Sequence, residues 1–463
     1  MEYEDFNYED IEYLAVQLPE DILKEKWSGN FERARAVIQS RLRGELPYPL
    51  RRRLELEFMN LDNLESSYTV SKEEALKQVR ERIPGMTEEE FDRLQEEGKI
   101  DWIYLEGEVM YIDSFCATLF KVYPELWKRS AEGDKSDYRM LDRLIADLSD
   151  GQEISAHIHI KQTLSVAPEA VEEGRNIYVH MPILHEKRGV RNLKIIDIKP
   201  EPKYTAPADA AQPTVYFEET AKCDQVFSVE YSFDHVVKYI DLAKADPEKV
   251  SSAEFPDETM QFLDECLPHI QFTPYLEALA DEIAGDETNP LLIARRIYDF
   301  ITTKTDYRFV RDYAGIENLS EYCALNLKGD CGVQALLFIT LCRISGIPAK
   351  WESGIDAKPG DVGEHDWAMF YVPSVGWAYA DLSYGNSSYL RNADKRWNFY
   401  FGNIDPFRIP VNSDFQKDFD PPKKFRRMDP YDNQCGEIEY DDRGLYGKDL
   451  VYGYHEIDIH LNK

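Results

Sequence analysis

The first 150 residues show a mostly helical pattern of hydrophobic and polar positions. Two helix starts stand out, because Ser71 and Thr87 are each followed three residues later by a glutamate, as in a capping box. Two β-rich segments, 100–105 and 108–111, flank a Glu-Gly pair and predict a short hairpin. We therefore predict a helical N-terminal module over residues 1–150.

Two helices and a hairpin resemble a winged-helix arrangement, which in other proteins can bind DNA. The second predicted helix is acidic, however, and carries the following side chains: Glu88, Glu89, Glu90, Asp92, Glu96 and Glu97. A DNA-binding helix would need lysines and arginines instead. We expect this module to contact protein or to act as a scaffold.

From about residue 152 the pattern changes to short β-rich segments separated by turn residues. These segments are 157–160, 176–181, 193–198, 214–217 and 226–231. Several strands at this spacing predict an antiparallel, Ig-like β-sandwich over residues 151–240. His157 and His159 would share one strand face, and we interpret them as ordinary strand residues because no third metal ligand lies within reach in sequence.

Residues 241–272 have the composition of a linker with some short helix. A helix then begins at Asn289-Pro290, with an N-cap and a proline at its first position. A second helix follows Cys331 and ends at Gly346. We place a further domain over residues 273–463, completed by C-terminal strands at 397–402 and 450–459, so that the fold class is α+β.

Composition and charge exclude several classes of function. The chain has 463 residues and a formal net charge of −33, and phosphate binding requires a positive patch, so we expect no nucleic-acid partner. The basic segment 421–427 is interpreted as an internal ion-pairing loop. No signal peptide or membrane span is evident. The seven cysteines lack motif spacing, which indicates reduced thiols in a cytoplasm and no metal site.

Cys331 is the first candidate for chemistry. It falls in the first turn of its predicted helix, where free amides and the helix dipole favour an anion and lower a thiol pKa toward neutrality. Gly329 and Gly332 on either side permit close approach of backbone or substrate. The alternative is a buried, inert cysteine, as we expect Cys342 to be on the same helix. The local pattern leaves both interpretations open.

A thiolate nucleophile needs a base and a group that orients the base. A predicted hairpin turns at residues 373–376, with His365 near the start of its first strand and Asp381 at the end of its second strand. The two side chains share a face only if the loop holds an odd number of residues, for example 372–376, which pairs Tyr371 with Trp377. The site is therefore tested by the hairpin register and by whether His365 lies near the sulfur of Cys331.

The order of these residues resembles the core of the transglutaminase-like superfamily, over about residues 325–385 with a helical approach from about 274. The matching motifs are Cys331 at a helix start, Gly346-Ile347-Pro348-Ala349, Ser353-Gly354, His365 two before Trp367, Gly376-Trp377 and Asp381-Leu382-Ser383. The sequence departs from the family at Asp366, where a small residue is usual, and at Lys350-Trp351. Asp366 would raise the pKa of His365 if it approached that imidazole.

The family has a papain-like triad. The resemblance implies that Cys331 is the nucleophile, His365 the general base and Asp381 the residue that orients it. The oxyanion would be stabilised by the Cys331 amide and by a second donor, for which Tyr307, Tyr322 and Asn326 are the alternatives. Trp367 and Trp377 are packing residues that could also form aromatic walls, and with Tyr322 they are our expected substrate-side residues.

The resemblance implies attack on a peptide or protein amide to form a cysteine thioester. We expect water as the acyl acceptor, hence a cysteine peptidase or amidase in a bacterial cytoplasm, without metal or cofactor. Two alternatives remain: a lysine amine as acceptor, which makes a crosslinking transglutaminase, and a catalytically silent scaffold with the same fold. The sequence does not give the oligomeric state.

Overall fold

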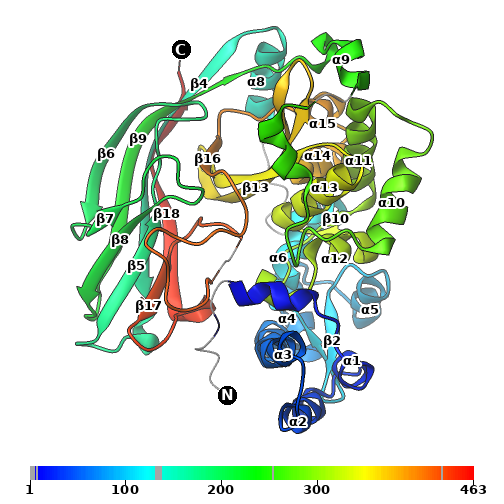
Figure 1. Ribbon diagram of the computed structural model, residues 1–463, viewed down its shortest axis with the longest axis vertical. Coiled ribbons are helices and arrows are strands. Elements are labelled where there is room, and N and C mark those ends of the chain that lie inside the picture. The colour runs from blue at the N-terminus through cyan, green and yellow to red at the C-terminus, as the bar shows by residue number, and fades with distance from the viewer. Residues whose placement is uncertain (1–5, 7–8, 131–137, 253–254, 429–430, 463) are drawn as a thin grey trace.

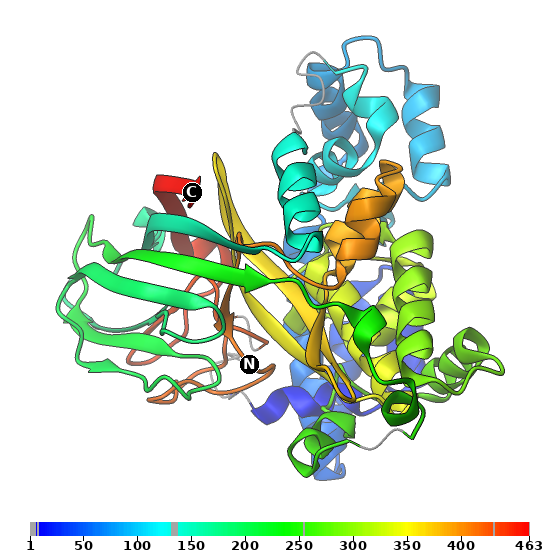
Figure 2. The ribbon, with the colours of Figure 1, turned by 90° about the horizontal axis from the view of Figure 1, so that it is seen from above.

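The computed structural model describes residues 6, 9–130, 138–252, 255–428 and 431–462. Figure 1 shows a helical N-terminal module, a β-sandwich and a core in which helices pack on a central sheet. In Figure 2 the yellow strands of the core sheet lie between the sandwich on one side and the core helices on the other. The architecture confirms the prediction of an α+β fold with antiparallel sheets and a helical N-terminal region.

The N-terminal module consists of helices around a small antiparallel sheet with strand order β1-β3-β2. Its elements are η2 (Glu9–Ala15), α1 (Glu20–Trp27), α2 (Phe31–Leu42), α3 (Tyr48–Ser67), β1 (Val70–Ser71), α4 (Lys72–Arg82), α5 (Glu88–Glu96), β2 (Trp102–Leu105), β3 (Glu108–Tyr111), α6 (Phe115–Val122) and α7 (Pro124–Trp127). The next helix, α8 (Arg139–Ser149), packs outside this module (Figure 1), with its buried residues in the hydrophobic core of the rest of the molecule.

Both predicted capping boxes of this module are confirmed. The Ser71 hydroxyl accepts a hydrogen bond from the Glu74 amide at 3.3 Å, and the Thr87 hydroxyl accepts one from the Glu90 amide at 3.2 Å. The predicted hairpin is β2–β3. The rings of Phe91, Tyr111 and Phe115 pack together in a core that belongs to this module.

The sandwich has two four-stranded antiparallel sheets with strand orders β17-β5-β8-β7 and β18-β4-β9-β6. Its elements are β4 (Glu153–Val166), η3 (Pro168–Ala170), β5 (Asn176–Pro182), β6 (Val190–Lys199), β7 (Tyr204–Thr205), β8 (Thr214–Thr220), β9 (Phe227–Lys238), β17 (Glu437–Tyr440) and β18 (Leu450–Leu461). The two sheets meet where the rings of Phe217 and Phe227 lie 5.3 Å apart and where the Tyr231 hydroxyl donates to the Pro182 carbonyl.

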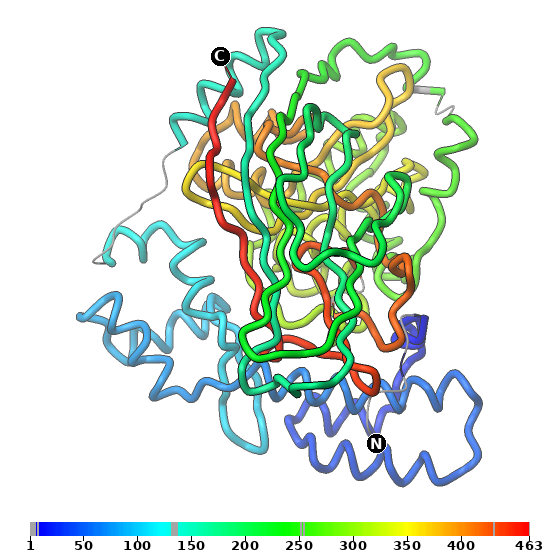
Figure 3. The backbone as a smooth tube through the Cα atoms, turned by 90° about the vertical axis from the view of Figure 1, so that its left-hand side faces the viewer, coloured from blue at the N-terminus to red at the C-terminus, as the bar shows by residue number. Residues whose placement is uncertain are grey.

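The assignment of all C-terminal strands to the core domain was wrong. β17 pairs with β5, and β18 pairs with β4 along most of its length, so both strands complete the sandwich (Figure 3). Strand pairing between such distant segments is decided by tertiary packing, which local pattern does not contain. His157 and His159 lie on β4 and pair with Asp234 and Glu230 of β9.

The core contains one five-stranded antiparallel sheet of order β15-β14-β13-β12-β16. The remaining elements are η4 (Leu242–Lys244), α9 (Pro247–Ser252), η5 (Asp257–Leu263), α10 (Pro274–Ala284), α11 (Pro290–Lys304), β10 (Asp306–Tyr307), η6 (Tyr313–Gly315), α12 (Leu319–Asn326), β11 (Lys328–Gly329), α13 (Cys331–Ile344), β12 (Ala349–Lys358), β13 (Asp361–Val372), β14 (Gly376–Ala380), α14 (Leu382–Leu390), α15 (Asp394–Phe399), β15 (Phe401–Gly402), β16 (Arg408–Asn412) and η7 (Gly447–Asp449).

Two local predictions for this region have different outcomes. The helix start at Asn289 is confirmed, because its side chain accepts hydrogen bonds from the amides of Leu291 and Leu292. The strand predicted at 397–402 is wrong over its first half, where Trp397 to Phe399 form the end of α15. Aromatic residues favour strands, but here the rings pack from a helix against their neighbours.

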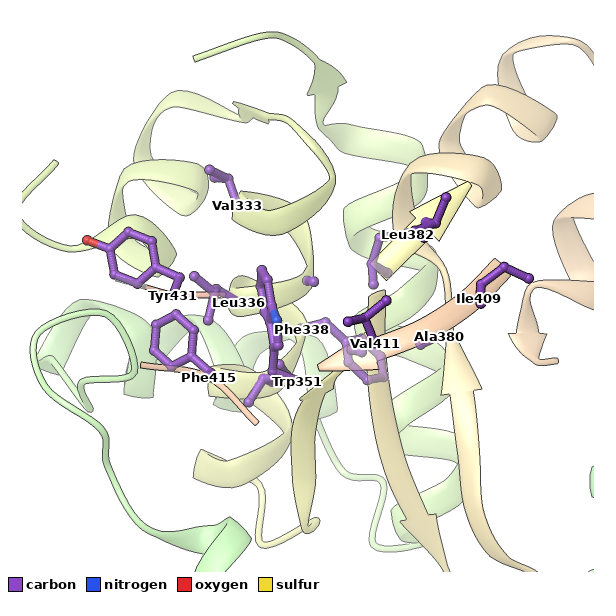
Figure 4. Packing of buried hydrophobic residues seen from close by; sticks show 14 of the residues in the cluster. Val333, Leu336, Phe338, Trp351, Ala380, Leu382, Ile409, Val411, Phe415 and Tyr431 are labelled. Atoms are coloured by element: carbon purple, nitrogen blue, oxygen red, sulfur yellow. The ribbon is translucent and has the colours of Figure 1, made fainter. Parts of the chain in front are cut away.

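The central helix α13 is buried from Gly332 to Arg343. It is apolar on all sides because the sheet covers one face and other helices cover the rest. The Phe338 ring contacts Phe370 of β13 with centroids 5.7 Å apart. Figure 4 shows side chains of this core, among them Phe338 of α13, Trp351 of β12 and Val411 of β16. The position of α13 on the sheet fixes the position of its first residue, Cys331.

The basic segment 421–427 forms internal ion pairs, as predicted. Lys423 and Arg427 both contact the buried Glu437 of β17, at 2.8 and 2.5 Å. In the described part of the chain, no helix combines the length and apolar character needed to cross a bilayer.

Candidate active site

Cys331 is the first residue of α13, and three local contacts hold it there. The N-cap residue Asp330 accepts a hydrogen bond from the Val333 amide at 3.1 Å and another from the Tyr313 hydroxyl. Upstream, Tyr307 of β10 pairs in parallel with Gly329 of β11. By helix geometry the Cys331 amide has no intrahelical acceptor, so it is available to a ligand.

Gly332 is required by the packing at the start of α13. A Cβ at this position would lie 2.5 Å from the Tyr313 hydroxyl, 2.7 Å from Asp366 Oδ2 and 2.9 Å from the Trp351 ring. These distances are shorter than a carbon atom tolerates. The glycine thus lets the helix terminus approach β12 and β13 closely.

The hairpin β13–β14 brings His365 and Asp381 together. Tyr371 pairs with Trp377 in the register that the site required, so His365 and Asp381 share a face of the sheet. His365 Nε2 lies 2.9 Å from Asp381 Oδ2. Because Nε2 contacts Asp381, Nδ1 is the ring nitrogen of His365 that can exchange a proton with a group in the cavity.

Asp381 is held in place from several directions. It caps α14 by accepting a hydrogen bond from the Tyr384 amide at 3.1 Å, and Arg408 Nε lies 3.3 Å from its Oδ2. Burial disfavours the charged carboxylate, but the attraction of His365 and Arg408 outweighs it and lowers the pKa of Asp381. Asp381 is therefore an anion that can orient and stabilise the imidazole.

The sulfur of Cys331 contacts Asp366 and not His365. Its hydrogen bond goes to Asp366 Oδ2 at 3.4 Å, and the described contacts include none between the thiol and His365. Successive residues of a strand point to opposite faces, and Asp366 lies on the same face as Phe370, which packs on α13. The sequence left open whether Asp366 approaches the imidazole, and in the structure its carboxylate contacts the thiol.

The structure also corrects the expected thiol pKa. Burial raises the pKa of Cys331 well above its usual range, and the carboxylates of Asp366 and Asp330 add to the increase. Burial likewise raises the pKa of Asp330 to about 6. The helix terminus favours the thiolate, but the two neighbouring carboxylates and the loss of water outweigh it. In this arrangement the thiol is protonated.

Cys331, His365 and Asp366 line one cavity of about 1140 Å³. The N-terminal module contributes Arg82, Lys121 and other side chains to its wall. The cavity is large enough for a peptide segment, because ligand sites of small molecules measure about 300–1,000 Å³.

Of the three alternatives for a second oxyanion donor, the geometry favours Tyr307. Tyr307 lines the cavity. Burial raises the pKa of the Tyr307 hydroxyl, and the nearby Cys331 adds to this increase. Tyr322 and Asn326 are absent from the described cavity lining, and the Asn326 amide donates to the Tyr322 carbonyl. Tyr307 therefore keeps its proton and can donate it in a hydrogen bond.

The substrate-side residues expected from the sequence do not face this cavity. The described lining lacks Trp367, Trp377 and Tyr322. Trp367 is fully buried and donates to Glu352 at 2.9 Å, while Trp377 packs on the Tyr371 ring. The aromatic residues of this sheet are packing residues, which is the other role that the sequence allowed.

Sequence reasoning missed Gln434 and Arg408. Gln434 donates to Asp366 Oδ1 at 2.7 Å and to the His365 carbonyl at 3.0 Å, which holds the start of β13 against the segment before β17. Neither residue lies in a recognisable motif, so no local signal could have found them. Among the described residues, no group of three or more His, Cys, Asp or Glu side chains could hold a metal ion.

Comparison with known proteins gives one family match. The family model of the transglutaminase-like superfamily matches residues 277–382. No curated protein matches the chain.

Several solved structures are similar at low identity, among them the following three. The "Putative Cysteine Protease" of Cytophaga hutchinsonii is 15% identical, covers 67% of this chain and 90% of its own, and has a TM-score of 0.42. The periplasmic domain of TgpA from Pseudomonas aeruginosa is 14% identical, with coverages of 55% and 96% and a TM-score of 0.28. The "putative protease" of Parabacteroides distasonis is 10% identical, with coverages of 50% and 42% and a TM-score of 0.21.

Proposed function

Residues 277–382 form a transglutaminase-like core, and we propose that this core performs thiol-dependent acyl transfer on peptide or protein amides. One observation carries the proposal. The cavity that holds the Cys331 thiol also holds His365, whose Nε2 is bound to the buried anion Asp381 at 2.9 Å. A thiol, an imidazole and an orienting carboxylate are the groups that such a reaction requires.

In the proposed first half-reaction, the thiol turns from Asp366 to His365 and gives its proton to Nδ1. The sulfur then adds to the amide carbonyl, and the oxyanion accepts hydrogen bonds from the Cys331 amide and the Tyr307 hydroxyl. The C–N bond breaks as His365 returns the proton to the leaving amine. The product is a thioester on Cys331 and a free amine.

In the second half-reaction, His365 takes a proton from water, which attacks the thioester carbonyl. The C–S bond breaks, the sulfur recovers a proton from His365, and a carboxylic acid leaves. We take water as the acceptor because it needs no binding site of its own, whereas a lysine side chain would need a second channel. Asp381 keeps the imidazole in the required orientation through both steps.

The rival function is a binding protein that keeps the fold without turnover. The observation in its favour is the contact of the thiol with Asp366, since that carboxylate and burial raise the pKa of Cys331. A nucleophile must lose its proton readily, so the resting arrangement works against catalysis. The two functions predict different outcomes for a bound amide: the enzyme breaks the amide bond, and the binding protein leaves it intact.

The deciding experiment is mass spectrometry of a glutamine peptide after incubation with the protein, with and without a primary amine. Deamidation or cleavage that disappears in Cys331→Ala supports hydrolysis. Incorporation of the amine makes the chain a transglutaminase instead. An unchanged peptide in both arms, across a panel of sequences, overturns turnover and favours the binding protein. Cys342→Ala, on the same helix but fully buried, is the matched control and should behave as the native protein.

A further inference from the structure

The wall of the cavity that comes from the N-terminal module is both cationic and aromatic. Lys121, near the end of α6, places its Nζ 5.0 Å from the centre of the Tyr307 ring and 4.7 Å from that of Phe309. Arg82, the last residue of α4, lies 5.0 Å from the Phe120 ring. All five side chains line the cavity. Contacts with aromatic faces hold the two cations in place without neutralising them.

Both cations lack a carboxylate partner among the described residues. Lys358 in the same cavity shows the contrast, because it pairs with Asp356 at 3.1 Å and with Asp361 at 3.3 Å. Both side chains are also exposed to solvent, so a ligand that enters the cavity can reach them. Arg82 and Lys121 therefore have charge available for a ligand.

The cationic wall lies close to the reacting thiol. Tyr307, under Lys121, pairs with Gly329, two residues before Cys331. Burial and two carboxylates raise the pKa of Cys331, and the positive charge of Lys121 is near enough to lower it slightly. A group bound by Lys121 therefore belongs to a residue near the scissile amide.

Carboxylates also line the cavity, and Asp361 and Glu364 of β13 are two of them. Asp361 pairs with Lys358, and Glu364 accepts a hydrogen bond from Cys435 at 3.2 Å. A negatively charged ligand is repelled by carboxylates and attracted by Arg82 and Lys121.

We propose that Arg82 and Lys121 form a subsite for a carboxylate of the peptide substrate, near the scissile amide. The proposal rests on the proposed function, since it takes the ligand of this cavity to be a peptide. The carboxylate comes either from an aspartate or glutamate side chain or from a free C-terminus. The N-terminal module would in this way select acidic peptides for the core.

The test uses acetylated, amidated octapeptides of alanine around one central glutamine, in which each flanking position in turn carries Glu or Gln. A second pair differs only in a free or an amidated C-terminus. We expect the full chain to prefer one Glu peptide, or the free acid, by about fivefold in kcat/KM, the factor of one partly solvated ion pair. Lys121→Gln and Arg82→Gln should bring that ratio close to one, and Lys128→Gln, an exposed lysine outside the cavity lining, should not.

A binding measurement distinguishes an incorrect subsite from an incorrect proposed function. Fluorescence anisotropy with labelled peptides and the Cys331→Ala chain measures the same preference without turnover. A charge preference in binding that Lys121→Gln removes supports the subsite even if no peptide is hydrolysed. Equal binding and equal kcat/KM for charged and neutral peptides overturn it, whether or not the core is active.

Discussion

At the residue scale, Asp366 and Cys331 form a pair in which the carboxylate works against ionisation of the thiol. A carboxylate 3.4 Å from the sulfur favours the protonated thiol and disfavours the thiolate, because two like charges would then lie side by side. The second oxygen of Asp366 is held by Gln434 at 2.7 Å, so the carboxylate does not turn away freely. Asp366, the residue after His365, therefore adds to the effect of burial in keeping the Cys331 thiol protonated.

We predict that Asp366→Asn activates the thiol. Removing the negative charge lowers the pKa of Cys331, so below that pKa more thiolate is present at a given pH. The rate of alkylation by iodoacetamide should rise about tenfold for each unit that the pKa falls. Rates measured from pH 6 to pH 10 on each variant give the midpoint of the profile, which should move to lower pH.

Two controls make this measurement specific. Peptide mapping must distinguish Cys331 from Cys435, which lines the same cavity, and Cys435→Ser removes that second thiol. Asp361→Asn removes a carboxylate from the same cavity that is not among those raising the pKa of Cys331. An unchanged midpoint in Asp366→Asn would mean that burial and Asp330 hold the thiol protonated without Asp366.

The sequence identified the candidate residues but not their contacts. The motif placed Cys331, His365 and Asp381, and hairpin parity correctly required the last two to share a face. Which neighbour touches the sulfur depends on how α13 crosses the sheet, and that angle is decided by buried residues such as Phe338 and Phe370. A one-residue difference along a strand reverses the direction of the side chain.

At the element scale, the start of α13 is set by how closely it approaches the sheet. We predict that Gly332→Ala displaces this helix terminus, because the new methyl group would lie 2.7 Å from Asp366 Oδ2. Overpacking of this kind costs about 1–3 kcal/mol. Thermal denaturation should show a lower Tm, and the alkylation rate of Cys331 should change as well. Gly363→Ala, on β13 with no atom within 4 Å of the added carbon, should match the native protein.

Strand β16 contributes a buried cation that holds several acidic residues of the core. Arg408 contacts Asp356 at 2.7 Å, Asp381 at 3.3 Å and Asp405 at 3.4 Å. We predict that Arg408→Met lowers the free energy of unfolding by about 3–5 kcal/mol, because buried carboxylates lose their partner. Arg408→Lys should recover only part of this loss, since lysine lacks the planar fork. A Tm equal to that of the native protein in Arg408→Met would contradict the prediction.

Helices with a local start signal could be predicted, whereas an element decided by distant packing could not. Ser71, Thr87 and Asn289 all act as the N-caps that their sequences indicate. The segment 397–399 has strand-like composition and is helical, since Trp397 packs against Tyr298 of α11. The tertiary contact, and not the intrinsic strand propensity of these residues, determines that this segment is helical.

At the scale of the whole molecule, one arginine joins the sandwich to the core. Arg188, between β5 and β6, lies 3.0 Å from Glu352 of β12 and donates to the carbonyls of Val411 and Asn412. The Glu352 side chain is only 1% exposed. Breaking such a pair from one side leaves a buried charge without its counterion.

We predict that Arg188→Ala lowers the free energy of unfolding by about 3 kcal/mol, and that Arg188→Ala with Glu352→Gln regains part of the loss. The comparison of single and double variants by denaturation measures the coupling. Arg33→Ala, which breaks an exposed pair with Glu25, should cost less than about 1 kcal/mol. A double variant no more stable than the arginine variant alone would show that the lost packing of Arg188 is responsible.

The strands β17 and β18 have a consequence for biosynthesis. A ribosome releases the chain from its N-terminus, so β4 and β5 emerge long before the strands that cover them. The N-terminal module and the core can close first, while the half-built sandwich exposes strand edges that invite pairing with other chains. A message truncated before codon 450 would therefore yield a product prone to aggregation, with its core already folded.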